Sequence, residues 1–138
     1  METLTLKYLM LYPKAKIQAP VNRVGIVLNY YVKSNSITLQ LEDPSVEYRV
    51  NISDCKLILR PLKNSLVQAE KDYLLKTFLK PNDYDFDCLF FDEIEESIAF
   101  LLDILPFNMV AKLIDYLRSI DIDIDGLKEK GLCIYENK

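Results

Sequence analysis

Histidine is missing from the 138 residues of this chain. Its absence removes the side chain that most often serves as a general base and as a neutral metal ligand, together with every Ser-His or Cys-His nucleophile pair. Carboxylates and lysines can also catalyse, so the absence does not exclude an enzyme. It favours a protein without catalytic activity, which is what we expect.

Glycine and cysteine are scarce as well, with three residues of each. None of the glycines belongs to a motif of nucleotide-dependent or common hydrolytic enzymes. The cysteines, Cys55, Cys88 and Cys133, are widely spaced and include no C-x-x-C pair. Neither a disulfide framework nor a zinc site follows from that spacing. We therefore expect no cofactor, no bound metal and a location in a reducing cytoplasm.

Long apolar runs are also lacking. The longest, residues 98–105, is interrupted by Asp103 and is far shorter than the roughly 20 residues that cross a bilayer. The first residues mix polar and apolar side chains, and Glu2 stands where a secretory signal has basic residues. No signal peptide and no membrane association are expected.

The composition that remains is that of a globular protein, with half of the residues hydrophobic and 28% charged. The length predicts a single domain over 1–138, divided into a β-rich half, 1–62, and a mainly helical half, 63–138. Alternating and β-branched residues bounded by turn residues predict strands in the first half. These strands cover residues 23–32, 37–42, 46–52 and 56–59.

Helical spacing of apolar residues dominates the second half. It predicts a first helix over Lys63–Leu79, a second from near Asp92 to about Leu105, and a third that opens at Pro106 or Phe107. A short closing strand is expected over Leu132–Glu136. The predicted fold class is α+β, with a small antiparallel sheet or SH3-like barrel followed by about three helices and that strand.

Charge is shared unevenly along the chain, whose formal net charge is −4. Residues 1–63 carry a net charge of +4, and residues 64–138 carry −8. Eight acids and no basic residue lie between Lys80 and Lys112. This asymmetry is the strongest functional indication in the sequence.

The acidic segment admits three functional interpretations. Its first acids could gather around Mg²⁺ or Ca²⁺, but Cys88 stands where a calcium loop turns on glycine. A pair of its carboxylates could share a cleft as acid and base. Acids interleaved with aromatic rings could also form a recognition face for a basic partner, and we favour this interpretation. The candidate binding residues are Asp83, Tyr84, Asp85, Phe86, Asp87, Asp92, Glu93, Glu95 and Glu96. A solvated loop and helix N-terminus remains the alternative.

Direct nucleic-acid binding was weighed separately, because small barrels often bind strands through basic and aromatic residues. The chain offers such residues in its β-rich half. They are Arg23, Lys33, Arg49, Lys56, Arg60 and Lys63, with Tyr30, Tyr31 and Tyr48. The sequence pI of about 4.9 opposes this function, since neutralised phosphates supply most of the affinity. We expect no direct nucleic-acid binding.

The stretch D-I-D-I-D-G at Asp121–Gly126 begins like a calcium loop. An EF-hand loop closes through a bidentate Glu at position twelve, where this chain has Leu132. Alternation of Ile with Asp instead indicates an extended segment with one buried and one solvated face. In that interpretation Ile122 and Ile124 reach the core, and Gly126 supplies a turn.

Two further stretches resemble a known family. They are K-L-I-L-R-P-L at Lys56–Leu62 and I-D-G-L-K-E-K-G-L-C-I at Ile124–Ile134. Their order and spacing are similar to those of small uncharacterised proteins common in phages and prophages of Bacteroidetes-type bacteria. Members often carry His and aromatic residues before the first of those glycines, where this chain has the Ile-Asp alternation. The resemblance implies an accessory protein of a mobile element that acts in the bacterial host cytoplasm.

Accessory proteins of that kind frequently bind a host factor. By this analogy we expect a non-catalytic protein that binds a host protein with a basic surface through the acidic segment. Such binding could inhibit a nucleic-acid-handling or defence complex of the CRISPR or restriction type. A metal-dependent enzyme that uses the Asp clusters, and a self-associating structural component, are the alternatives.

Overall fold

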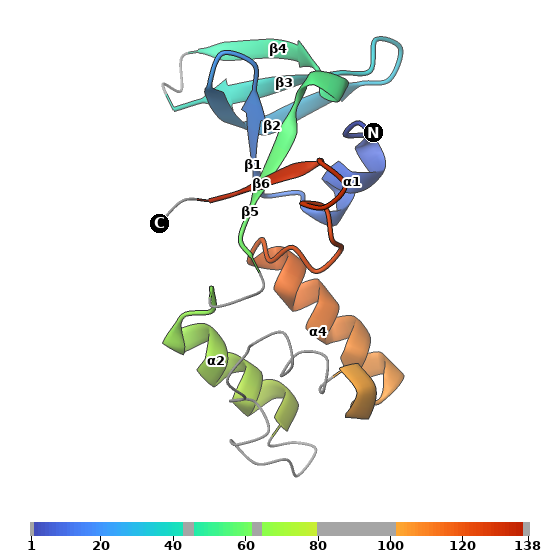
Figure 1. The fold of residues 1–138 in the computed structure, drawn as a ribbon, viewed down its shortest axis with the longest axis vertical. Helices are drawn as coiled ribbons and strands as arrows, with labels where there is room; N and C mark the ends of the chain where they lie inside the picture. The colour runs from blue at the N-terminus through green and yellow to red at the C-terminus, as the bar shows by residue number, and fades with distance from the viewer. Residues whose placement is uncertain (1, 43–45, 62–64, 80–101, 137–138) are drawn as a thin grey trace. The chain divides into compact units, whose positions relative to one another are not determined.

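A computed structural model describes residues 2–42, 46–61, 65–79 and 102–136. The chain forms two compact units, one made of Met1–Arg60 with Arg118–Lys138 and the other of Pro61–Leu117. The first unit contains a six-stranded sheet, and the second is helical within its described part. Figure 1 shows that this sheet is curled. The α+β prediction is confirmed.

The elements of the first unit follow one another with short connections. They are α1 (Leu6–Leu11), β1 (Lys16–Ala19), β2 (Arg23–Tyr31), β3 (Ser36–Leu41), β4 (Glu47–Asn51), the 3₁₀ turn η1 (Ile52–Asp54), β5 (Lys56–Leu59) and β6 (Cys133–Tyr135). The strand order is β4-β3-β2-β1-β5-β6. All neighbours are antiparallel except β5 and β6, which run parallel, so the sheet is mixed.

Strand alternation decides which side chains face the core. Ile17, Ile37, Leu39 and Leu57 are fully buried, and the strand register places them on one face of the sheet. The shift in register between Val27 and Asn29 leaves Leu28 as an extra, exposed residue of β2. Such a bulge increases the local twist of a strand, in agreement with the curl of the sheet.

The N-terminal segment closes this core. Leu4, Leu9 and Tyr12 are buried against the sheet together with Leu127 and Leu132 from the returning C-terminal segment. The sequence predicted no helix in this segment. Six residues are too few for a stable isolated helix, so α1 depends on this burial.

The second unit contains α2 (Gln68–Leu74), the π-helical turn η2 (Leu75–Leu79) and α4 (Phe107–Ser119). The third predicted helix is confirmed, because α4 begins at Phe107 and buries Leu113 and Leu117. Tyr73 and Tyr116 stack with ring centroids 4.3 Å apart. Most of the second predicted helix lies outside the described residues.

Gly25 is the position where the sheet tolerates no side chain. A Cβ there would lie 2.6 Å from the Gln40 carbonyl oxygen, which belongs to the backbone of the neighbouring strand. We expect Gly25→Ala to destabilise the fold by about 1–3 kcal/mol, because β2 and β3 must separate to admit the methyl group. Urea unfolding measures this change.

The matched control is Gly126→Asn. Gly126 has a φ of +70°, and a Cβ atom added there would have no other atom within 4 Å. Asn tolerates this left-handed region of backbone conformation. We expect this variant to unfold within about 1 kcal/mol of the parent. Equal losses for the two variants would contradict the close approach at Gly25.

Candidate functional site

The candidate acidic and aromatic binding residues, Asp83 to Glu96, all lie outside the described residues. Their role therefore stays a prediction. The described residues contain two other groups of polar side chains. One is the C-terminal aspartate segment, residues 121–125, and the other is the outer face of the sheet, which is the face opposite the core.

Tyr12 connects the C-terminal aspartate segment to the N-terminal part of the chain through hydrogen bonds. Its ring is buried, and its hydroxyl lies 2.7 Å from Asp125 Oδ2 and 3.0 Å from the Ile122 carbonyl oxygen. The same hydroxyl accepts a hydrogen bond from the Ile124 N–H. Burial and the Asp125 carboxylate raise the pKa of Tyr12 well above its ordinary value. The phenol is therefore a neutral structural donor.

Asp123 is the most buried acid of this segment, with 6% of its surface exposed. Its carboxylate accepts from the Leu127 and Lys128 N–H groups at 2.9 and 3.1 Å. The Tyr135 hydroxyl donates to it at 3.1 Å. The prediction that the aspartates of the Ile-Asp alternation are solvated is thus wrong for Asp123. Its burial is tolerated because these hydrogen-bond donors offset the loss of hydration of the charge. Ile122 is buried and Gly126 has a positive φ, as predicted, whereas Ile124, which was also expected to reach the core, is only partly buried.

Asp125 forms a two-point ion pair with Arg118. The Arg118 Nη2 and Nε atoms lie 2.8 and 3.1 Å from its two oxygens. Burial alone would raise the pKa of Asp125, but the hydrogen bonds from Arg118 and Tyr12 hold that pKa below its ordinary value. The carboxylate is therefore charged at neutral pH and occupied by its partners.

Asp121 has a different environment. Burial raises its pKa, and the nearby Arg60 opposes this shift. Its N–H and C=O groups serve the fold, since its carbonyl accepts from the Arg60 N–H at 2.7 Å. The carboxylates of Asp123 and Asp125 are thus committed to separate partners, whereas the buried Asp121 Oδ1 atom has no hydrogen-bond partner among the described residues. The described residues contain no group of three His, Cys, Asp or Glu that could hold a metal ion.

The two described cysteines, Cys55 and Cys133, are buried and unpaired. Burial raises the pKa of Cys55 to about 11. Burial and the neighbouring Asp123 raise the pKa of Cys133 to about 12. Thiolate is the reactive form of cysteine, so both environments disfavour nucleophilic chemistry at neutral pH.

An arginine and a tyrosine cover the outer face of β2, β3 and β4. The Arg49 guanidinium lies over the Tyr31 ring at 4.1 Å from its centroid. It also donates to Ser36 Oγ at 3.2 Å and Ser34 Oγ at 3.0 Å. Ser36 and Thr38 of the middle strand are buried although they face outward. Arg49 and Tyr31 cover these short side chains, which fixes the guanidinium in place.

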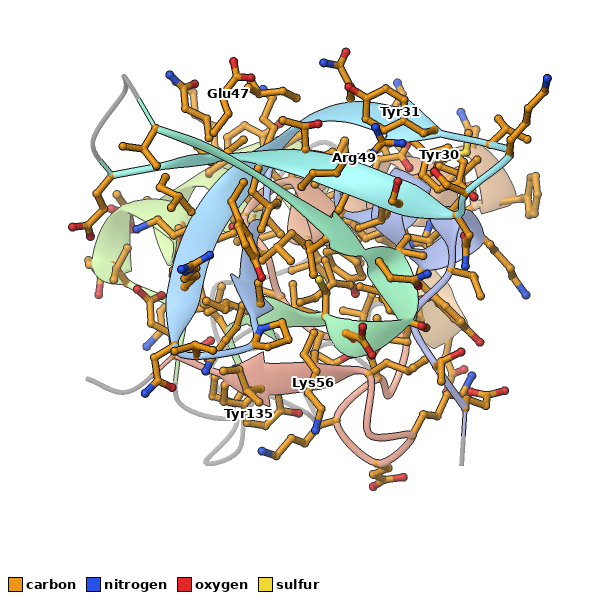
Figure 2. The ribbon with its side chains drawn as sticks, turned by 90° about the horizontal axis from the view of Figure 1, so that it is seen from above. Tyr30, Tyr31, Glu47, Arg49, Lys56 and Tyr135 are labelled. Carbon is orange, nitrogen blue, oxygen red and sulfur yellow. The ribbon has the colours of Figure 1, made fainter. Side chains whose placement is uncertain are left out.

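Of the basic and aromatic residues considered for nucleic-acid binding, Lys63 lies outside the described residues, and those on the strands are divided between the two faces of the sheet. Arg23 lies over the Tyr48 ring, 4.2 Å from its centroid, and Tyr48 and Tyr30 pack against the core. Arg49 and Tyr31 belong to the outer face. Figure 2 shows Lys56 and Tyr135 in the lower half of the picture and Tyr31 and Arg49 in the upper half. The described members of this set therefore do not form one continuous stacking platform.

An open groove of about 270 Å³ lies beside Gly25. Its lining residues come from β1, β2 and the end of β3, with Lys16 and Glu42 as the charged members. The others are Val24, Gly25, Ile26, Gln40 and Leu41. The groove carries too few polar groups to define a ligand.

No protein-family model, curated protein or solved structure matches this chain. None of the helices within the described ranges combines the length and apolar character that a bilayer crossing requires. The fold defines an α+β protein with a curled six-stranded mixed sheet. Its described polar groups mainly hold that fold together.

Sequence reasoning missed two of these arrangements. It predicted no role for Tyr12, although this residue reaches residues more than a hundred positions away. It named Arg49 and Tyr31 as separate members of a surface, whereas the strand register joins them. No local pattern signals either contact, because both depend on which strands and segments are neighbours.

The Asp125 ion pair predicts how stability depends on pH. Because the pKa of Asp125 is lowered by folding, its contribution is complete above the unfolded-state pKa of about 3.9 and is lost as pH falls through the folded-state pKa. Asp125→Asn should therefore cost about 1–2 kcal/mol near neutral pH. The difference from the parent should shrink below about pH 4. Urea unfolding at a series of pH values measures it.

Asp103→Asn is the control, since Asp103 is exposed and makes no described contact with this network. It should leave the unfolding free energy unchanged near neutral pH. A cost of Asp125→Asn that stays constant down to pH 2.5–3 would contradict the role of the charged carboxylate.

Proposed function

We propose that this protein is a non-catalytic binding protein that acts on another protein. The observation that carries this proposal is the division of its acids. Asp123 and Asp125 are committed to hydrogen bonds within the fold, whereas the sequence between Lys80 and Lys112 holds eight acids and no basic residue. Such a concentration of one charge suits association with an oppositely charged surface.

The partner that this charge favours is a host protein with a basic surface. A groove that normally holds a nucleic acid is such a surface, because it presents Lys and Arg to phosphates. The acids alternate with Tyr84 and Phe86 in the sequence, which pairs negative charge with apolar anchors. An accessory protein of a phage or prophage could thereby bind to such a groove in a nucleic-acid-handling or defence complex of the bacterial cytoplasm. The resemblance of the two sequence stretches supports this setting by analogy.

Charge reversal tests the acidic segment. The variant in which Asp92, Glu93, Glu95 and Glu96 become Lys should lose binding to a partner isolated with the parent protein from host lysate. The physical reason is that four negative charges become positive, which changes the net charge by eight units against a basic surface. Isothermal titration with the purified partner measures the loss, and affinity for the parent should fall as salt concentration rises.

A matched control carries the same change in charge on described, exposed acids outside the segment. These acids are Glu42, Asp54, Asp115 and Glu129. Their reversal to Lys should weaken binding much less, since only net charge and not the contact is altered. Equal effects of the two variants, or an unchanged affinity of the first, would remove the acidic segment from the proposed interface.

The competing function is a metal-dependent enzyme that uses the Asp clusters. Titration calorimetry of the full chain with Mg²⁺, Mn²⁺ and Ca²⁺ distinguishes it from the binding protein. We expect no stoichiometric heat at millimolar metal, because Asp123 and Asp125 already accept hydrogen bonds from Tyr12, Arg118 and backbone N–H groups. Saturable binding of any of these ions at one site per chain would favour the enzyme.

A further inference from the structure

The outer edge of β4 carries hydrogen-bonding groups that no described strand uses. β4 is the terminal strand of the sheet and pairs only with β3 among the described residues. Figure 1 shows it as the outermost strand at one end of the curled sheet. The pairing with β3 has no register shift, and β4 contains no proline. The edge is therefore regular and able to accept another strand.

Two backbone hydrogen bonds fix which groups point to this edge. The Leu41 N–H donates to the Val46 carbonyl, and the Ile52 N–H donates to the Asn35 carbonyl. In an antiparallel pair hydrogen-bonded and non-hydrogen-bonded positions alternate. The N–H and C=O groups of Tyr48 and Val50 consequently face β3. Those of Glu47 and Arg49 face away from it.

The side chains of Glu47 and Arg49 carry opposite charges on the same outer face. Both residues are exposed. Arg49 contacts Tyr31, Ser34 and Ser36, and neither Arg49 nor Glu47 forms an ion pair with any described residue. Figure 2 shows the two side chains at separate positions along β4. Arg49 is therefore held in position without an ion-pair partner among the described residues.

We propose that two copies of this chain pair through their β4 edges, antiparallel and centred on Tyr48. In this register Glu47 of one copy lies opposite Arg49 of the other, and the second such pair follows by symmetry. Both residues have outward N–H and C=O groups, so each pair also forms two backbone hydrogen bonds. The contact is isologous, as expected of a two-fold dimer.

The other registers compatible with these outward groups lack this charge match. A pair centred on Arg49 would place two guanidinium groups opposite each other, and one centred on Glu47 would do the same with two carboxylates. Centring on Val50 would place Arg49 opposite the neutral Asn51. Opposite charges stabilise a cross-strand pair and like charges destabilise it.

The inner face of the proposed pair also fits. Residues 46, 48 and 50 alternate with the charged positions, so Val46 of one copy would lie opposite Val50 of the other. Val46 is 40% exposed, although Val50, two positions along the same strand, is only 8% exposed. Pairing would cover the exposed valine with an apolar side chain. The second copy is thus complementary to the strand on both of its faces.

Sedimentation and light scattering of the full chain from micromolar to near-millimolar concentration test this proposal. We expect a monomer–dimer equilibrium. Glu47→Arg and Arg49→Glu should each raise the dimer dissociation constant roughly tenfold or more, because each creates two like-charge pairs. The double variant restores opposite charges in the same register and should bring the constant back to within about threefold of the parent.

Lys56→Glu is the matched control for Arg49→Glu. Lys56 is exposed on the same face but belongs to an interior strand, so its reversal should leave the equilibrium unchanged. Because Arg49→Glu also removes the contact with Tyr31, thermal unfolding of each variant should accompany the measurement. Glu47→Pro provides a variant that keeps Arg49: it removes an outward N–H without removing a bond to β3, and it should abolish dimerisation.

Hydrogen exchange at single residues gives an independent measurement. The amides of Glu47 and Arg49 should exchange rapidly in dilute protein and become protected as concentration rises, whereas the amides of Tyr48 and Val50 should be protected throughout. A protein that stays monomeric at every concentration would overturn the proposal. So would a dimer that is insensitive to Glu47→Pro, or single-variant losses that the double variant does not restore.

Discussion

The first unit depends on the hydrogen bonds that Tyr12 and Asp123 make with the returning C-terminal segment. The Tyr12 hydroxyl joins residues 12 and 125, and Asp123 joins the turn at 127–128 to Tyr135 of β6. β6 runs parallel to β5, and parallel neighbours require a long crossover connection. Here that connection includes the entire unit Pro61–Leu117. The hydrogen-bond network therefore stabilises the position of β6, which follows this long connection in the sequence.

This network also restricts what the described polar groups can do. A buried carboxylate is tolerated because its lone pairs are satisfied, and satisfying them with N–H and O–H donors removes them from ligand binding. The same constraint applies to Cys133, whose pKa is raised by burial and by Asp123. A sequence that resembles a calcium loop therefore forms hydrogen bonds that hold the C-terminal segment to the rest of the first unit. Charge available to a partner must come from elsewhere in the chain.

Local patterns predicted much of the fold. The strand predicted over residues 56–59 coincides with β5, and alternation found β3 within one residue at each end. The helix opening at Phe107 was also predictable, because its apolar residues recur at helical spacing. Local patterns gave neither the bulge at Leu28 nor the parallel pairing of β6. Both depend on which residues of another strand lie opposite, and that information is not local.

The candidate site was predictable to a smaller extent, for a related reason. Arg49 and Tyr31 lie on the two strands that flank β3. The side chains of Arg49 and Tyr31 meet across β3 because Ser36 and Thr38, which lie beneath them, are short. Asp123 was expected at the surface, since alternation carries no information about donors supplied by Leu127 and Tyr135. Composition identifies groups that can interact, whereas register decides which of them do.

The two proposed contacts of this protein involve different parts of the sequence, and their combination has an energetic consequence. Pairing through β4 would use Glu47 and Arg49 and leave the acids of Asp83–Glu96 outside the paired strands. A dimer would then carry two acidic segments on one particle. A partner with two basic surfaces within reach would bind the second segment at a high effective concentration, so modest affinity at each segment would produce strong overall retention. Weak self-association and weak electrostatic recognition could therefore reinforce each other without any additional contact.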